Sequence, residues 1–104
     1  MAFESEWRIL NSRILAVNSA GGAAASTTSV GSETYMVEIS APGLSTSSTS
    51  GIRVAIGEAP VADSTSAFVP ANWVSRYKLT PGQKVSVISN DASTPTMTLV
   101  ELTK

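Results

Sequence analysis

Apolar and polar residues alternate one by one in several segments of the last two thirds of the chain. In the clearest segment, the apolar positions Tyr35, Val37, Ile39 and Ala41 alternate with Met36, Glu38 and Ser40. A period of two with one apolar face is typical of a half-buried β-strand. The same pattern predicts strands near 35–41, 52–56, 74–79, 84–89 and 96–102, and a short apolar piece at the sheet edge over 67–70.

Turn-forming residues separate these segments. Pro42-Gly43 ends the first strand, and Thr80-Pro81-Gly82-Gln83 predicts a type II turn in which Gly82 has a positive φ. No segment of helical period lies between the predicted strands. The sequence therefore predicts an all-β fold, a small antiparallel β-sandwich or jelly-roll-like barrel with an N-terminal arm.

The N-terminal segment allows two interpretations. Trp7, Leu10, Ile14 and Val17 have the spacing of one helical face, whereas two short strands broken at Asn11-Ser12 fit the β-rich remainder better. Residues 21–29 consist of Gly, Ala, Ser and Thr, a composition typical of a loop or linker. We therefore expect residues 1–32 to be an arm and loop, with a first strand possible within 7–17, and residues 33–104 to be the sandwich domain.

The alternation also predicts which side chains form the core. Arg53 and Lys78 are expected to face water or a partner, opposite the apolar faces of their strands. The residues expected to be buried are Val37, Ile39, Ile52, Val54, Ile56, Val85 and Val87.

Length, charge and hydropathy narrow the class of protein. A chain of 104 residues with 42% hydrophobic and 14% charged residues fits one globular domain. The net charge is −1, and no cluster of Lys and Arg is present, which argues against nucleic-acid binding. No apolar run reaches the length of a membrane span, and the acidic start does not resemble a secretory signal.

Catalytic chemistry finds little support in the composition. The chain has no His and no Cys, so imidazole bases, disulfides and the usual transition-metal ligands are missing. Most of the eight acidic residues lie beside turns or on predicted solvent faces, where we expect solvated surface carboxylates. Asn90-Asp91 fits a hairpin turn better than a calcium site. We therefore predict a protein that is not an enzyme and has no cofactor.

Aromatic and apolar residues near the N-terminus, together with Trp73, are the candidates for a protein interface. Trp73 is either an aromatic that caps the core or an anchor for a partner, since tryptophan is enriched in binding hot spots. Trp7 belongs to the core if the arm packs on its own domain, and to a neighbour if it reaches outward. The interface candidates are Phe3, Trp7, Ile9, Leu10 and Trp73.

The segment from Gly51 to Lys104 contains five motifs in a fixed order. They are an Ile-Arg-Val-Ala-Ile-Gly strand at 52–57, a Pro-containing Ser/Thr loop at 60–66, Val-Pro-Ala-Asn at 69–72, Pro-Gly-Gln-Lys at 81–84 before an alternating strand, and Glu-Leu at 101–102. In this series of motifs the segment resembles small structural proteins of tailed bacteriophages. The resemblance covers about half the chain, and each motif alone is also common in β-sandwiches.

This resemblance implies a virion component, made in the host cytoplasm, of the capsid decoration or cement type. Its partners would be the major capsid protein or other virion proteins, with a homo-oligomer expected and neither nucleic acid nor membrane bound. A neck, tail or fibre-base protein is the main rival within the same class. A carbohydrate- or ligand-binding β-sandwich module is the alternative from another class.

Overall fold

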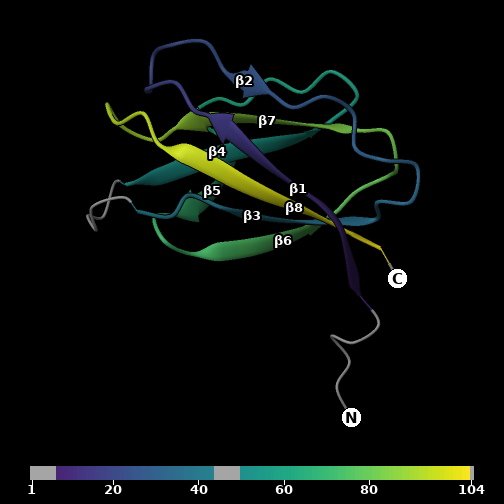
Figure 1. Ribbon diagram of the computed structural model, residues 1–104. Coiled ribbons are helices and arrows are strands. Elements are labelled where there is room, and N and C mark those ends of the chain that lie inside the picture. The colour runs from purple at the N-terminus through teal and green to yellow at the C-terminus, as the bar shows by residue number, and fades with distance from the viewer. Residues whose placement is uncertain (1–6, 44–49, 104) are drawn as a thin grey trace.

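Two four-stranded antiparallel sheets form the described part of the computed structural model, which covers residues 7–43 and 50–103 (Figure 1). Sheet A has the order β1 (Arg8–Ala16), β8 (Thr96–Thr103), β3 (Met36–Ser40), β6 (Val74–Lys78). Sheet B has the order β2 (Ala25–Ser26), β7 (Lys84–Ser89), β4 (Gly51–Gly57), β5 (Ala67–Pro70). The predicted all-β sandwich is confirmed. None of the described residues forms a helix with the length and apolar character needed to cross a membrane.

The five strands predicted from alternation are all present. They correspond to β3, β4, β6, β7 and β8, and the apolar piece at 67–70 is β5, an edge strand of sheet B. The alternation is a local property of each segment, so it could be detected without knowing which strands pair.

Residues 8–16 form one continuous strand rather than a helix or two short strands. β1 pairs antiparallel with β8 along its whole length, and the irregularity is a β-bulge between Ile9 and Asn11 instead of a break at Asn11-Ser12. Residues 25–26 pair with β7 of sheet B. The segment expected to be an arm thus contributes a strand to each sheet, and the strand that the sequence allowed within 7–17 is present.

The core lies between the two sheets. Directly paired residues point to the same face of a sheet, so every second row of paired residues points inward. The inward rows of sheet A pack against the inward rows of sheet B. All the predicted core residues are buried except Ile56, which is partly buried against the cluster. The cluster also includes Val17, Val30, Ala41, Val69, Met97 and Leu99. Each fully buried aliphatic side chain of this kind stabilises the fold by about 1.5–3 kcal/mol.

The turn from sheet A to sheet B follows the predicted chemistry. Between β6 and β7, the N–H of Gln83 donates to the carbonyl of Thr80 at 3.2 Å, and Gly82 has a φ of 90°. A side chain at Gly82 would meet nothing within 4 Å, so the requirement for glycine there is conformational rather than steric.

The connection between β4 and β5 lies against the outer face of sheet B. The N–H of Ala62, which is 3% exposed, donates to the outward hydroxyl of Ser86 at 2.9 Å. The Arg53 side chain, also on this face, lies 4.7 Å from the centre of the Phe68 ring and donates to the Ser66 carbonyl at 3.1 Å. Arg53 therefore lies on the face opposite the core, as expected, where it is partly covered by its own chain.

Candidate functional site

Three rows of paired residues cross the outer face of sheet A. They alternate with the rows that contain Val37 and Ile39, which face the core, so the side chains between them point outward. From β1 to β6 the rows are Ile14–Thr98–Ser40–Val74, Ser12–Val100–Glu38–Arg76 and Ile9–Leu102–Met36–Lys78.

Several large apolar side chains on the edge strands of this face are exposed, whereas Leu102 on the central strand β8 is buried. Ile14 is 75% exposed, Ile9 71% and Val74 59%, and Trp73, which precedes β6, is 66% exposed. Leu10, in the β1 bulge, is also exposed. Single exposed apolar residues are ordinary, but a group of them on one face indicates a surface that binds another molecule. Ile9, Ile14 and Val74 lie in the outward rows, and Leu10 and Trp73 directly follow or precede them in the sequence. We call these five residues the outer apolar surface of sheet A.

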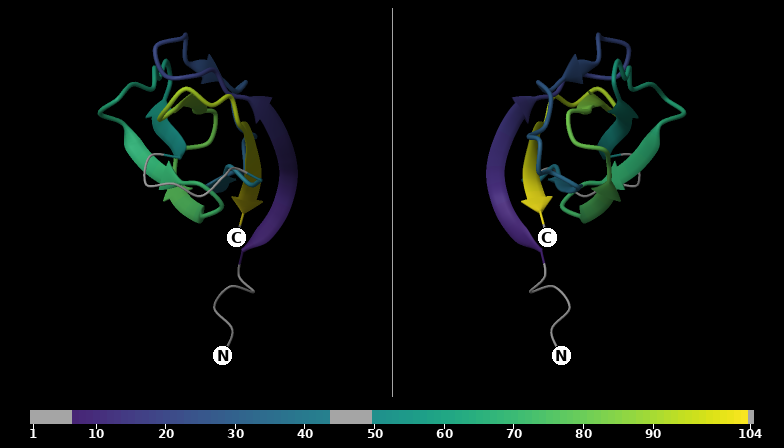
Figure 2. Two further views of the ribbon diagram at one scale, coloured as in Figure 1. Left: turned by 90° about the vertical axis from the view of Figure 1, so that its left-hand side faces the viewer. Right: turned by 90° about the vertical axis from the view of Figure 1, so that its right-hand side faces the viewer.

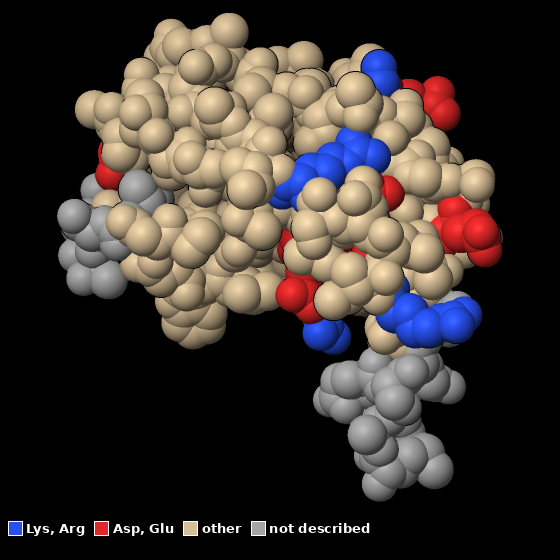
Figure 3. Space-filling model, in the orientation of Figure 1, with Lys and Arg blue, Asp and Glu red and all other residues tan. Residues whose placement is uncertain are grey.

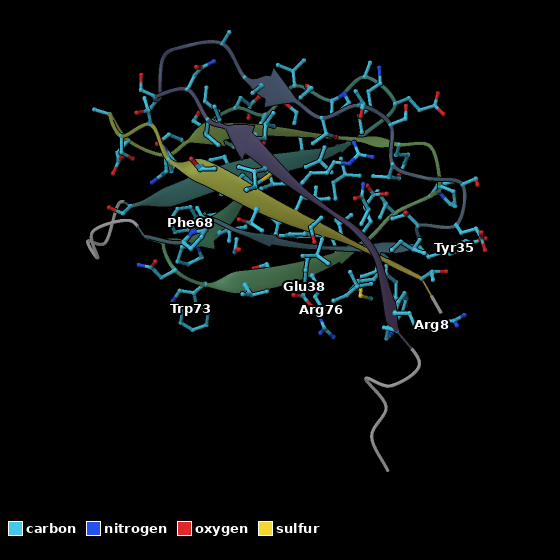
Figure 4. The ribbon with its side chains drawn as sticks, in the orientation of Figure 1. Arg8, Tyr35, Glu38, Phe68, Trp73 and Arg76 are labelled. Carbon is cyan, nitrogen blue, oxygen red and sulfur yellow. The ribbon has the colours of Figure 1, made fainter. Side chains whose placement is uncertain are left out.

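Charge on the outer face of sheet A is largely compensated. In its middle row, Arg76 Nη2 lies 2.7 Å from Glu38 Oε2, and Arg76 Nε donates to the same oxygen at 2.8 Å (Figure 4). A partly exposed pair of this kind adds little stability, but it removes the net charge of the row. The space-filling view shows charged side chains on only small parts of the visible surface (Figure 3). Such a surface can approach a neighbour without strong repulsion.

The predicted interface residues fall into two groups. Trp7, Ile9 and Leu10 lie at or just before the start of β1, whereas Trp73 lies at the opposite end of the molecule from Arg8 (Figure 4). Phe3 lies outside the described residues. The exposure of Trp73 does not fit an aromatic that caps the core.

An open pocket that the sequence did not predict lies at the end of sheet A. Trp7, Tyr35, Lys78 and Leu79 line a volume of about 360 Å³. The N–H of Leu79 donates to the Tyr35 carbonyl at 3.2 Å, which extends the pairing of β3 and β6 and holds one side of the pocket. Two aromatic rings beside one ammonium group could bind a small molecule with a flat apolar side and an anionic or hydroxyl group.

Glu101 is the main correction to the predicted solvated carboxylates, because it is 2% exposed and points into the sandwich. Its Oε1 accepts hydrogen bonds from the Gly31 N–H at 2.9 Å and the Thr34 hydroxyl at 2.7 Å. Its Oε2 lies 2.7 Å from Arg13 Nε. Period two gave the signal, since Met97 and Leu99 share its face of β8.

The surroundings of Glu101 fix its charge. Burial raises the pKa of Glu101, but the hydrogen bonds from Gly31 and Thr34 and the charge of Arg13 outweigh it, so the pKa lies below its ordinary value. The carboxylate is therefore ionised and fully engaged. It holds the 31–34 segment to β1 and β8, and the structure gives it no exposed position from which to act on a substrate.

Residues 7–43 and 50–103 contain no group of three or more His, Cys, Asp or Glu that could hold a metal ion. Ser75 and Lys78 have the Ser-x-x-Lys spacing of one class of acyl-transfer enzymes, which was not among the predicted sites. Residues three apart on a strand point to opposite faces, so Ser75 lies in an inward row and Lys78 in an outward one. They cannot act as a nucleophile and its base.

No protein-family model, curated protein or solved structure matches this chain. The surfaces described above are therefore the basis for any statement about function. Two of these features depart from an ordinary solvated exterior, the outer apolar surface of sheet A and the pocket at Trp7 and Tyr35.

Proposed function

We propose that this protein is a non-enzymatic structural component of a tailed-bacteriophage particle, a capsid decoration protein that binds assembled capsid subunits through the outer face of sheet A. The observation that supports the proposal most directly is the outer apolar surface, with Ile14, Trp73 and Val74 more than half exposed. The resemblance of residues 51–104 to small phage structural proteins agrees with it.

The physical basis of such a role is linkage. A protein that binds the assembled shell but not free subunits stabilises the shell by mass action. Many identical weak contacts on one particle add up to strong attachment. An interface centre is depleted of charged residues, and the outer face of sheet A has its Glu38 and Arg76 paired with each other. Aromatic residues are enriched as binding anchors, and Trp73 would serve as one.

Purified phage particles from the source culture provide the first test. The protein should copurify with them at a fixed molar ratio to the major capsid protein, measured by quantitative mass spectrometry. Its absence from particles would overturn the proposal. A copy number similar to that of the major capsid protein fits decoration, whereas a far lower one would assign the protein to the neck, tail or fibre base.

Rebinding to stripped particles tests the surface. Trp73→Ala and Val74→Ser should weaken cosedimentation with particles, because they remove apolar contacts from the outer face of sheet A. Val61→Ser is the matched control, since Val61 is 74% exposed but lies in the β4–β5 connection, outside sheet A. Equal losses for Val61→Ser and Val74→Ser would contradict the proposed surface.

A ligand-binding module is the second candidate, and the pocket beside Trp7 and Tyr35 is the observation that favours it. Sugars bind to exposed aromatic faces, and a lysine at the rim could contact a hydroxyl or carboxylate group. Titration with a panel of neutral and acidic monosaccharides, followed by chemical shifts of the Trp7 indole N–H, tests this function. Saturable shifts that Tyr35→Ala abolishes would support it.

A further inference from the structure

The edge strands of the two sheets differ in how well they are protected. Unprotected edges invite pairing with another strand, and proteins usually block them with short strands, Lys or Pro. β2 has two residues, β5 has four and ends at Pro70, and β6 has five with Arg76 and Lys78 exposed. β1 has nine residues without Lys or Pro; of its two arginines, Arg13 is held by Glu101 and the Thr28 carbonyl, and the exposed Arg8 lies before the bulge, at the start of the strand. It lies at the outer margin of the ribbon in both views of Figure 2.

The backbone of β1 has a side without partners. In an antiparallel pair, every second residue of an edge strand directs its N–H and C=O away from the neighbouring strand. β1 pairs with β8 on one side. Over residues 9–16, the structure records no backbone hydrogen bond to any other described segment on the opposite side. The bulge at Leu10 interrupts the strand, but residues 11–16 form a regular run.

The sequence of β1 is self-complementary. Arg-Ile-Leu occurs at 8–10 and again at 13–15. The bulge places Ile9 and Ile14 on the same, outward face despite their odd separation. If two copies pair antiparallel with Ser12 at the two-fold axis, and the bulged Leu10 again has no direct partner, Ile14 of each copy lies opposite Ile9 of the other, and Arg13 lies opposite Asn11. No two like charges then face each other, and two exposed isoleucine pairs become buried against one another.

We propose that β1 pairs with β1 of a second copy of this chain, so that sheet A continues across a two-fold axis into the sheet of the partner. The pairing does not require a particle, so it goes beyond the function proposed above. It would also join two outer apolar surfaces into one continuous face and thereby double the contact offered to any third protein.

Sedimentation equilibrium of the purified full-length protein tests the proposal. A concentration-dependent dimer is expected, and Ile14→Lys should raise its dissociation constant by roughly tenfold or more, because a lysine on an edge strand opposes pairing. Val61→Lys, at an equally exposed position outside sheet A, should leave the constant unchanged. A protein that stays monomeric, or a dimer equally sensitive to both substitutions or to neither, would overturn the proposal.

Two further measurements test the pairing itself. In hydrogen exchange, alternate amides within residues 11–16 should gain protection as the concentration rises, and protection gained elsewhere instead would place the interface on another surface. In a mixing experiment, Ile14→Lys and Ile9→Glu should each dimerise poorly alone but form a heterodimer together, since the ammonium group of one faces the carboxylate of the other. Failure of the mixture would overturn the Ser12-centred register. Particle binding is measured in a separate assay. Failure of dimerisation therefore does not decide the proposed attachment to particles, and failure of attachment does not decide the proposed dimer.

Discussion

Ile88 on the outer face of sheet B is 8% exposed, whereas Ile14 on the outer face of sheet A is 75% exposed. Both belong to strands of one sandwich, and both point away from its core. Sheet B is partly covered by its own β4–β5 connection, tied down through Ala62 and Ser66. On sheet A, by contrast, Ile14 and Val74 lie at the two ends of one outward row, and both side chains are exposed. An outer sheet face is thus not polar by default, and a protein can cover it with its own chain or leave it for a neighbour.

The same substitution on the two outer faces should give the largest contrast. Ile88→Asp places a carboxylate in a covered site beside its cross-strand partner Arg53, whose guanidinium already contacts Phe68 and Ser66, and it should lower the free energy of unfolding by about 3 kcal/mol. Ile14→Asp leaves its charge in water and should cost about 1 kcal/mol or less. Urea unfolding of the two variants measures both. Similar losses would mean that the two faces are covered alike.

Gly51→Ala tests how closely β5 approaches β4 within sheet B. Gly51 has a φ of 151°, and a Cβ there would overlap the Val69 carbonyl oxygen and the Phe68 ring, against which Arg53 packs. We expect a loss of about 3 kcal/mol. Gly57→Ala at the other end of β4 is the control, because a Cβ there meets nothing within 4 Å and the φ is not positive. An equally large loss for Gly57→Ala in thermal or urea unfolding would show that the effect is not local crowding.

Glu101 makes the interior of sheet A respond to pH. Because the pKa of Glu101 in the folded state lies below its ordinary value of 4.5, the unfolded chain binds its proton more readily. The carboxylate therefore stabilises the fold above that value, and this contribution disappears as pH falls through the lower folded pKa. Glu101→Gln should cost about 2 kcal/mol at neutral pH and less at acidic pH.

Urea unfolding at several pH values should show the stability curves of wild type and Glu101→Gln converging as pH falls. Glu38→Gln is the comparison, since it removes the carboxylate of a more exposed pair and should cost less than about 1 kcal/mol. Parallel curves for wild type and Glu101→Gln would mean that the carboxylate does not contribute through its charge.

The smallest effect concerns the turn that joins the two sheets. Gly82→Ala should cost about 1 kcal/mol, because alanine disfavours the positive φ while its methyl group meets no neighbour. The outer faces should be unaffected, so Ile14 and Ile88 keep their exposures. An unchanged melting temperature would indicate that the turn relaxes to another conformation at no cost.

The fold was predictable from sequence as far as local patterns extend. Alternation located five strands, and Pro81-Gly82 predicted the positive φ of the turn. Strand order was not predictable, because nothing local to β1 indicates that it pairs with β8 rather than with β3. For the same reason, the segment expected to be an arm proved to contain an edge strand, and Val17 proved to be part of the core. Deleting residues 2–20 would remove both and should unfold the domain.

The candidate site was only partly predictable. Ile9, Leu10 and Trp73 were predicted as interface candidates, and the structure exposes all three. Ile14 and Val74 were missed, since their exposure depends on which face of sheet A lacks a cover. The pocket at Tyr35 and Lys78 was missed because it forms where separate strands end side by side. Glu101 could have been identified, since period two placed it on the face of Leu99.

The position of β8 between β1 and β3 has a consequence for synthesis of the protein. The ribosome makes β1 and β3 long before β8, so neither strand has this neighbour while the chain is growing. Until then, the backbone groups of β1 and β3 that pair with β8 have no partner in this sheet. Sheet A is complete only when β8 inserts between the two strands. Folding should therefore be late and slow, as expected for strands far apart in sequence. Nascent chains stalled before β8 should depend on chaperones, and their aggregation should begin at the β1 and β3 edges.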